Sequence, residues 1–238
     1  MAIIGDALSV LALKAKIHVT TMPYATVSFI RGGSTRATMT ANASGNCDLE
    51  ILVPDFGSWT VSASGEGGSG SSSVSVSDTI TYNTTVTLRR YFIQSGNWVS
   101  GVGHNKAGSG SIEFYDDGDY ILLKTYQGGS NEIGSGYITP AVSMNNWKTL
   151  YIDSQETGDY CYAGVSTDNS SNPPSFSASV QLCGKREDWD SRHTSSVSIA
   201  SVTGSRYLAL RTKAWITETI PVHGTGGQIR VWNMWLST

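Results

Sequence analysis

The residues best suited to contact a ligand lie in one charged segment, Lys185–His193, which reads KREDWDSRH. An indole surrounded by charges is rarely fully buried, and sugar rings stack their C–H faces on aromatic rings while polar side chains bind their hydroxyl groups. A glycan or receptor contact is therefore predicted for Trp189, Asp188, Asp190, Arg192 and His193. Trp215 is a second, weaker candidate. The alternative is a polar loop whose Trp folds back onto the protein.

Three acidic residues, Asp116, Asp117 and Asp119, surround Gly118 and have the composition of a calcium-binding loop. Calcium takes several oxygen ligands, often from such turns. The spacing differs from the D-x-D-x-D-G loop, however, and no Glu follows at the distance of a bidentate ligand. Asp and Gly are also the usual residues of a hairpin turn. A turn is therefore favoured over a calcium site, and no other cofactor is expected.

Catalytic patterns are absent from the sequence. Glycoside hydrolysis needs two carboxylates that face one cleft, and nothing in the spacing selects a pair from Glu113, Glu132, Glu156, Asp188 and Asp190. There is no G-x-S-x-G elbow and no H-E-x-x-H motif, and the 4 His are scattered. A non-catalytic protein is expected, and the alternative is a glycan-active hydrolase or its carbohydrate-binding part.

The composition argues against a nucleic-acid-binding or membrane-inserted protein. The 238 residues carry a net charge of -3, only 15% of them are charged, and Gly, Ser and Thr are abundant. No basic field is present to hold a nucleic acid, and no apolar run is long enough to span a bilayer. Such a composition is typical of extracellular or virion β-proteins.

The cysteines and the N-terminal segment allow more than one interpretation. The 3 Cys are too few for a disulfide scaffold, and Cys161 and Cys183 either pair across neighbouring strands or stay buried thiols. Residues 1–15 place apolar side chains on one helical stripe, which predicts an extension that packs on the protein or mediates homo-oligomer formation. Asp6 and the lack of a basic start argue against a signal peptide, so the protein would leave the host cytoplasm by another route, such as lysis.

Residues 16–89 are predicted to form one small β-sandwich. Short runs rich in Val, Ile and Thr alternate with turn residues at the spacing of such a fold. Gly65–Ser71 is interpreted as a mobile hairpin loop because of its Gly and Ser content. The predicted strands are Lys16–Thr21, Thr26–Arg31, Arg36–Ala41, Cys47–Val53, Gly57–Ser64, Ser72–Ser77 and Tyr82–Leu88.

The first domain contains the series ATVSFIRGGSTRATMTANASGNCDLEILVPDFGSWTVSAS, closed by TYNTTVTL. Its G-G-S-T turn and its V-P-x-F-G-x-W-T-V run, here Val53–Val61, resemble carboxypeptidase-regulatory-like and PEGA-like modules. The resemblance implies an Ig-like or transthyretin-like fold and a role as a spacer or adhesion unit in bacterial surface proteins or phage virions. Trp59 and Val61 alternate with Ser58 and Thr60, so Trp59 is predicted to lie in the core.

Residues 90–238 are predicted to form a larger sandwich of jelly-roll type. Its final strand is expected to pair with the first strand of the domain, with Ile229, Val231 and Trp235 on one face. The apolar alternation around Trp98, Trp147, Trp232 and Trp235 predicts that these rings are core residues. The predicted strands are Ser111–Tyr115, Tyr120–Tyr126, Asn146–Asp153, Asp159–Ser166, Phe176–Cys183, Ser195–Ser201, Arg206–Trp215 and Gln228–Leu236.

The strands GNWVSG, YLALRT and GGQIRVWNMWLS together are similar to those of galactose-binding-like and lectin-like jelly rolls. A spacer module joined to such a domain resembles accessory virion proteins of phages that infect gut bacteria. The resemblance implies a non-catalytic virion or extracellular protein that binds bacterial cell-surface glycans or other virion proteins, with weak sites strengthened by multivalency. The alternative is a purely structural capsid or tail component with no ligand.

Overall fold

The computed structural model describes residues 13–108, 111–126, 133–158, 160–167, 175–184, 188–213 and 225–238. The chain divides between Leu88 and Arg89 into two compact units. The predicted N-terminal extension lies outside the described residues as far as residue 12. Its predicted end at residue 15 is wrong, because Lys14 and Ala15 already belong to the first strand. No helix in the described ranges is long and apolar enough to cross a membrane.

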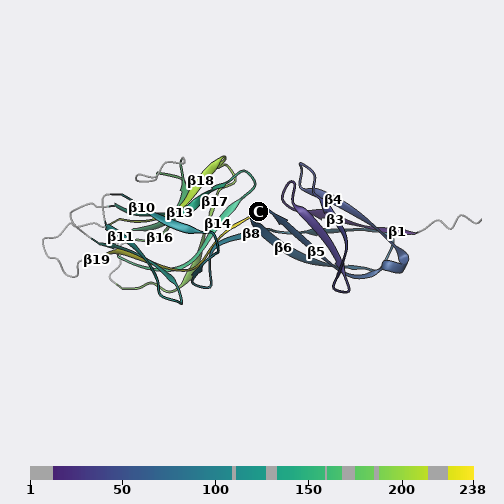
Figure 1. The fold of residues 1–238 in the computed structure, drawn as a ribbon, viewed down its shortest axis with the longest axis horizontal. Coiled ribbons are helices and arrows are strands. Elements are labelled where there is room, and N and C mark those ends of the chain that lie inside the picture. Colours follow the sequence, from purple (N-terminus) through teal and green to yellow (C-terminus); the bar gives the residue numbers. More distant parts are fainter. Residues whose placement is uncertain are drawn as a thin grey trace, which may run out of the picture. The chain divides into compact units, whose positions relative to one another are not determined.

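The first unit is a sandwich of two sheets (Figure 1). One sheet has the strand order β4-β1-β7 and the other has β6-β5-β2-β3. β1 runs parallel to β7, whereas the other neighbours are antiparallel. The elements are β1 (Lys14–Thr20), β2 (Thr26–Arg31), β3 (Ser34–Thr40), β4 (Asn46–Leu52), the 3-10 helix η1 (Val53–Asp55), β5 (Gly57–Gly65), β6 (Gly68–Val76) and β7 (Thr81–Thr85).

The alternation of apolar and polar residues decides which side chains of these strands point inward. Ile17 and Val19 of β1 and Phe29 of β2 are fully buried between the sheets. Trp59 of β5 is 4% exposed, and its indole N–H donates a hydrogen bond of 3.1 Å to the carbonyl oxygen of Asp55. The prediction that Trp59 lies in the core is confirmed.

The segment predicted as a mobile loop, Gly65–Ser71, is a tight hairpin between β5 and β6. Gly65 pairs with Gly68, and the residues between them, Glu66 and Gly67, have φ angles of 49° and 77°. Left-handed conformations at both central positions are those of a type I′ turn, whose twist matches the flanking strands. The predicted hairpin is confirmed, but its loop is shorter than predicted, because backbone pairing continues through the Gly and Ser residues as far as Gly68.

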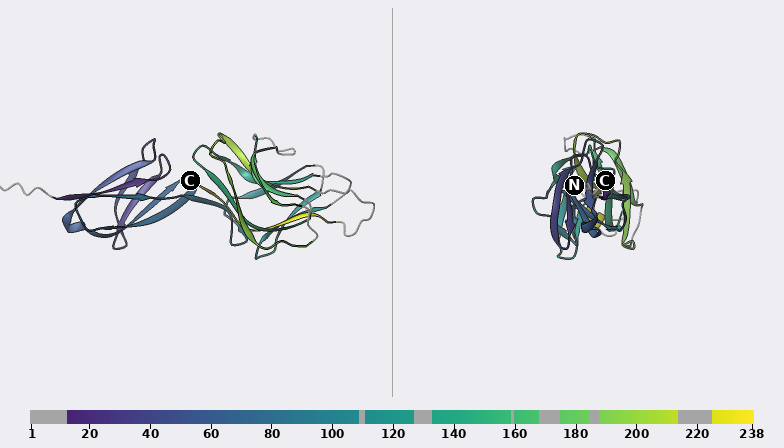
Figure 2. Two further views of the ribbon diagram at one scale, coloured as in Figure 1. Left: turned by 180° about the vertical axis from the view of Figure 1, so that it is seen from behind. Right: turned by 90° about the vertical axis from the view of Figure 1, so that its right-hand side faces the viewer.

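The second unit is a larger two-sheet sandwich (Figures 1 and 2). One sheet has the strand order β10-β13-β18-β15-β16. In the other sheet, β14 pairs with one edge of β19, and β12 and β8 pair with its opposite edge. β11 pairs with β12, and β17 pairs with β14. The strands are β8 (Arg89–Gln94), β9 (Asn97–Trp98), β10 (Gly103–Gly108), β11 (Ser111–Asp116), β12 (Ile121–Tyr126), β13 (Ile133–Ser143), β14 (Thr149–Thr157), β15 (Cys161–Ser166), β16 (Phe176–Cys183), β17 (His193–Ser198), β18 (Ser205–Lys213) and β19 (Thr225–Ser237). The all-β fold class is confirmed, as is the β11–β12 hairpin. The final strand pairs with β8 rather than with the GNWVSG segment expected as the first strand, whose strand β9 pairs with β8 instead.

A β-bulge in β19 changes which residues of this strand face outward. Asn233 lies opposite Asp153 of β14, but the next partner pair is Val231 with Ser154, so Trp232 is inserted as an extra residue. A bulge of this kind shifts the alternation of the strand by one position. The residues after the bulge therefore exchange faces relative to the pattern that the sequence suggests.

The exchange is visible in the burial of the last residues. Met234 and Leu236 take the inner positions, and Trp235 turns to the outer face. The prediction that Trp232, Trp235 and Trp98 are core residues is wrong, because each of them is only half-buried. Trp147 is 1% exposed and lies in the core as predicted.

Candidate functional site

The outer face of the sheet formed by β12, β19 and β14 carries most of the side chains with ligand-binding character. In β14, burial alternates so that Tyr151, Asp153 and Gln155 point outward, whereas Ile152 and Ser154 point into the sandwich. The bulged part of β19 and the residues just before β17 add further side chains over this face. Strands therefore position Asp153, Gln155 and the bulged residues of β19, whereas the turns and connections beside them carry Ser95, Asp119, Tyr120 and Arg192.

Arg192 is fixed to this outer face by Asp153. Its Nε and Nη2 donate hydrogen bonds of 2.8 and 2.7 Å to the two carboxylate oxygens, which is a bidentate geometry. Asn233 Nδ2 donates to the same carboxylate at 2.8 Å. The hydrogen bonds from Arg192 are the main reason why the pKa of Asp153 lies below its usual value, and the same contact raises the pKa of Arg192. The guanidinium lies 4.4 Å from the ring centroid of Trp232.

A second arginine, Arg230 of β19, lies between two aromatic rings. Its guanidinium carbon is 3.7 Å from the ring centroid of Trp189 and 4.9 Å from that of Tyr120. Gln155 Oε1 accepts a hydrogen bond of 3.1 Å from Arg230 Nη1. Tyr120 in turn lies 5.4 Å from Trp232, with the ring planes tilted by 59°. Aromatic rings and guanidinium groups therefore alternate across the face, and each contact restrains its neighbour.

A shallow hollow of about 440 Å³ opens between these side chains. The rings of Trp232 and Tyr120 supply apolar surface, the Asp119 carboxylate supplies acceptors, and Arg192 supplies N–H donors. An apolar wall with a few placed polar groups is typical of small-ligand sites. Its lining consists of Ser95, Asp119, Tyr120, Arg192, Trp232 and Asn233.

A separate aromatic stack lies along the C-terminal part of β19. Trp235 stacks on Tyr151 with ring centroids 5.0 Å apart and planes at 7°, and on Tyr91 at 5.7 Å and 29°. Both faces of the Trp235 indole are therefore covered by protein rings. A ligand would meet its edge rather than its face, so this stack is less suited than the hollow to hold a sugar ring.

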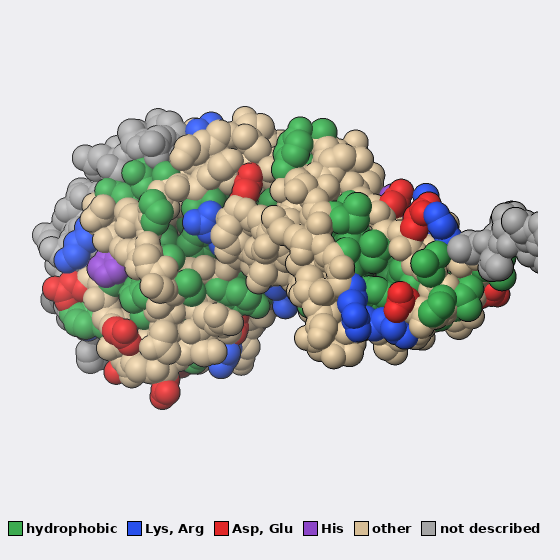
Figure 3. Space-filling model, turned by 45° about the vertical axis from the view of Figure 1, so that its right-hand side comes forward, with side chains coloured by type: hydrophobic (Ala, Val, Ile, Leu, Met, Phe, Trp, Pro, Cys, Tyr) green, Lys and Arg blue, Asp and Glu red, His purple; other side chains and the backbone are tan. Residues whose placement is uncertain are grey.

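Charges of both signs are interspersed on the second unit. On the face shown in Figure 3, its Lys, Arg, Asp and Glu side chains stand singly among polar and apolar ones. The net charge of the chain is -3. Neither observation indicates the continuous positive surface that a nucleic-acid backbone requires.

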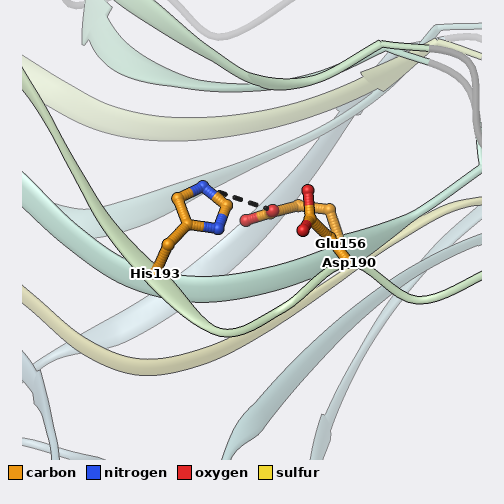
Figure 4. Close-up of side chains that lie close together, drawn as sticks. All are labelled: Glu156, Asp190 and His193. Carbon is orange, nitrogen blue, oxygen red and sulfur yellow. Dashed lines mark ion pairs between the residues drawn. The ribbon is translucent and has the colours of Figure 1, made fainter.

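A second cluster lies on the inner side of β14, at the start of β17 (Figure 4). Glu156, Asp190 and His193 bring a carboxylate oxygen, a second carboxylate oxygen and a ring nitrogen within 4.8 Å of one another. The side chain of Glu156 is 0% exposed, and its Oε2 lies 3.7 Å from His193 Nε2. The backbone N–H of Asp190 donates a hydrogen bond of 2.8 Å to the carbonyl oxygen of Glu156, which ties this stretch to β14.

The predicted site residues separate into two groups. Trp189 and Arg192 reach the outer face, whereas Asp190 and His193 join Glu156 on the inner side. Asp188 is exposed. Trp215 lies outside the described residues.

The residues that complete the hollow were not predicted to contact a ligand, chiefly Trp232, Tyr120 and Asn233. The bulge at Trp232 cannot be recognised in the hydropathy pattern, so a single sequence could not predict that the Trp232 side chain lies on the outer face of the sheet. Asp119 was singled out, but as a metal ligand rather than as part of a groove.

The acidic segment predicted as a turn or a calcium site is a hairpin turn. Asp116 Oδ1 accepts a hydrogen bond of 3.1 Å from the backbone N–H of Gly118, whose φ is 81°. Asp117 hydrogen-bonds to Tyr120 and raises its pKa. The turn is confirmed; calcium binding by Asp116, Asp117 and Asp119 stays a prediction.

The cysteine pair that the sequence left open lies on adjacent strands. Cys161 of β15 is directly opposite Cys183 of β16, and both are buried free thiols. A hydrogen bond from Cys161 is the main cause that lowers the pKa of Cys183, and burial opposes it.

No protein-family model matches this chain, and no curated protein matches it in sequence. Among solved structures, it is similar to a family 29 carbohydrate-binding module, at 11% identity and a TM-score of 0.40 over 64% of this chain and 89% of that one. A mutant of such a module in complex with cellulohexaose gives 11% identity and a TM-score of 0.40, over 64% of this chain and 92% of that one. A structure described as carbohydrate-binding modules from the β-sandwich superfamily gives 12% identity and a TM-score of 0.37, over 90% and 85% of the two chains. At these TM-scores the likenesses carry no argument about activity, so any functional conclusion rests on the geometry of the site.

Proposed function

We propose that the second unit is a non-catalytic carbohydrate-binding domain that holds a glycan in the hollow beside Trp232. One observation carries this proposal. Two aromatic rings converge with a guanidinium, a carboxamide and a carboxylate on one open hollow of about 440 Å³. A sugar offers C–H faces to the rings and hydroxyl groups to the polar side chains, so its two kinds of surface match the two kinds of lining.

The polar groups of the hollow are held in place before a ligand arrives. Asp153 fixes Arg192 through two hydrogen bonds and Asn233 through a third, and Asn233 Oδ1 accepts 3.0 Å from the backbone N–H of Ser95. Side chains ordered in the free protein lose less entropy on binding than mobile ones. This preorganisation favours a shallow binding site, where few contacts are available to offset that loss.

The arrangement of carboxylates supports binding over hydrolysis. Among the described residues, Asp119 lines the hollow, Asp153 is engaged by Arg192, and Glu156 lies on the inner side of β14. Hydrolysis of a glycosidic bond requires two carboxyl groups that flank the bond in one cleft. The described acidic residues do not offer that arrangement at the hollow.

The sequence resemblances are the basis for a wider proposal. We place this domain in a phage virion or surface accessory protein, in which the first unit acts as a spacer and bacterial cell-surface glycan is the partner. Many copies on one particle would convert weak individual sites into strong attachment. The alternative is a purely structural virion component with no ligand.

Affinity electrophoresis in gels that contain soluble polysaccharides, followed by calorimetry on the retained ones, tests the proposal. We expect Trp232→Ala and Tyr120→Ala to weaken binding by about tenfold or more, which corresponds to about 1.4 kcal/mol. Tyr24→Ala is the matched control, because Tyr24 is an aromatic side chain of the first unit that is 69% exposed. Its binding should equal that of the wild type.

Three outcomes would contradict the proposal. If the wild type binds a glycan and Trp232→Ala and Tyr120→Ala bind it equally well, the site lies elsewhere. If the wild type binds nothing across a broad panel of bacterial and plant polysaccharides, the structural alternative is favoured. Turnover of any bound glycan would contradict the non-catalytic part.

A further inference from the structure

The cluster on the inner side of β14 combines features that a simple ion pair does not require. Glu156, Asp190 and His193 come from two separate segments, yet their ligand atoms lie within 4.8 Å of one another (Figure 4). Two atoms bound to one ion at about 2.0–2.2 Å lie at most about 4.4 Å apart, so the three groups would have to move slightly closer together to share an ion. Small side-chain rotations would bring all of them to a common centre.

The hydrogen bond of His193 decides which ring nitrogen faces the carboxylates. His193 Nδ1 lies 2.9 Å from the carbonyl oxygen of Ser191. A carbonyl only accepts, so Nδ1 carries the proton, and in the neutral imidazole the lone pair is on Nε2. Nε2 is the atom that lies 3.7 Å from Glu156 Oε2. Histidines that ligate metals characteristically donate their other N–H to a carbonyl or carboxylate in this way.

Charge and burial favour a cation at the centre of this cluster. A neutral Nε2 lone pair and two carboxylates would point electron density at one another, and the Glu156 side chain is 0% exposed. Buried carboxylates require positive charge nearby, from a proton, a basic side chain or a metal ion. An ion bound to the three groups would interact with the lone pair and with both carboxylates at once.

We propose that Glu156, Asp190 and His193 form a binding site for a divalent transition-metal ion. One imidazole nitrogen with two carboxylate oxygens is a ligand set for Zn²⁺ or Mn²⁺ rather than for Mg²⁺ or Ca²⁺, which prefer oxygen alone. The ion ties the segment before β17 to β14. That segment also carries Trp189 and Arg192, so the metal fixes the backbone from which they reach the outer face. The site does not depend on the proposed carbohydrate binding.

Calorimetric titration of the chelator-treated full chain with Zn²⁺ alone tests this site. We expect about one strongly bound ion per chain and a higher Tm in its presence, because a ligand that binds the native state stabilises it. His193→Gln should bind at least about tenfold more weakly and lose the Tm increase. The side chain of His193 is 33% exposed, so this variant is expected to fold.

A second variant and a matched control exclude trivial explanations. Glu156→Gln removes the buried charge at nearly constant volume, and circular dichroism reports whether it is folded. His18→Gln is the control, because His18 Nδ1 lies 2.6 Å from Asp48 Oδ1 and is also a His–carboxylate pair, but on the surface of the first unit. It should bind Zn²⁺ like the wild type.

The proposal is overturned if the wild type takes up no Zn²⁺, or if folded His193→Gln binds it unchanged. Uptake that disappears in His18→Gln would equally place the ion elsewhere. Co²⁺ in place of Zn²⁺ supplies a spectroscopic check of the ligands. Weak ligand-field bands are expected from nitrogen and oxygen ligands, whereas an intense thiolate charge-transfer band would overturn the ligand set in favour of Cys183.

Discussion

Replacing Asp153 by Asn tests whether the outer face is held together by charge. The Asp153 carboxylate accepts two hydrogen bonds from Arg192 and one from Asn233, at 2.7–2.8 Å, and its side chain is 14% exposed. Asn keeps the shape but loses the charge, and its NH₂ group meets the donors of Arg192. Charge-assisted hydrogen bonds contribute more than neutral ones, but Arg192 is 48% exposed and water screens the pair. We expect a loss of about 1–2 kcal/mol.

The pH dependence of this loss has a defined sign. Folding lowers the pKa of Asp153 below its ordinary value of 3.8, chiefly through the hydrogen bonds from Arg192. The stabilisation is therefore fully present above the pKa of the unfolded chain and is lost as pH falls through the lower folded value. Wild type and Asp153→Asn should differ by a constant amount between about pH 5 and 7 and converge below about pH 3.8.

Differential scanning calorimetry measures the effect. For a unit of this size, about 1–2 kcal/mol corresponds to a decrease in Tm of about 3–6 °C. Asp116→Asn is the matched control, because it removes one exposed carboxylate of the same unit and keeps the oxygen that accepts from Gly118 N–H. It should leave Tm within about 1 °C. A Tm for Asp153→Asn equal to that of the control, or a difference that persists at low pH, would refute the electrostatic explanation.

Three further substitutions or reactions test the packing. Gly70→Ala would place a methyl group on the carbonyl oxygen of Thr87, so we expect the free energy of unfolding of the first unit in urea to fall by about 2–3 kcal/mol. Gly33→Ala is the control: its methyl group would meet nothing within 4 Å, and its positive φ of 76° should cost only about 1 kcal/mol. Trp59→Phe replaces the buried indole by a smaller phenyl ring and removes the N–H that donates to the carbonyl oxygen of Asp55, so it should cost about 2 kcal/mol by the same measurement. An unchanged midpoint would exclude Trp59 from the core. Maleimide labelling followed by mass spectrometry should modify half-buried Cys47 in the native protein and Cys161 and Cys183 only in denaturant; failure of the last two to label even then would mean that they form a disulfide.

The strands that alternate regularly could be predicted from the sequence. The predicted and observed bounds of β2 coincide at Thr26–Arg31, and those of β16 at Phe176–Cys183. Three strands of the second unit, β8, β10 and β13, were missed. The Gly and Ser residues of β10 and β13 give no apolar period. The strand starting at Gly68 was shortened for the same reason. Apolar periodicity indicates which side chains are buried, and a strand of small residues shows little such periodicity.

The candidate site could be predicted only in part. The charged segment around Trp189 was identified because charges flank an indole, and two of its residues do reach the outer face. Their partners, Asp153, Trp232 and Arg230, come from β14 and β19, which meet this segment only in the folded chain. The spacing of these residues in the sequence does not predict that they come close together. The same holds for Glu156, which lies beside Asp190 and His193.

The bulge at Trp232 couples the outer face to the core of the same sheet. Deleting Trp232 would remove the ring and also restore regular alternation, which would turn Met234 and Leu236 outward and Trp235 inward. Burying the Trp235 indole in place of the Met234 and Leu236 side chains would then destabilise the whole second sheet. If the hollow binds a glycan as proposed, substitution at Trp232, Tyr120 or Asp119 would change its ligand preference, whereas a change in the length of β19 would disrupt the sandwich that supports it.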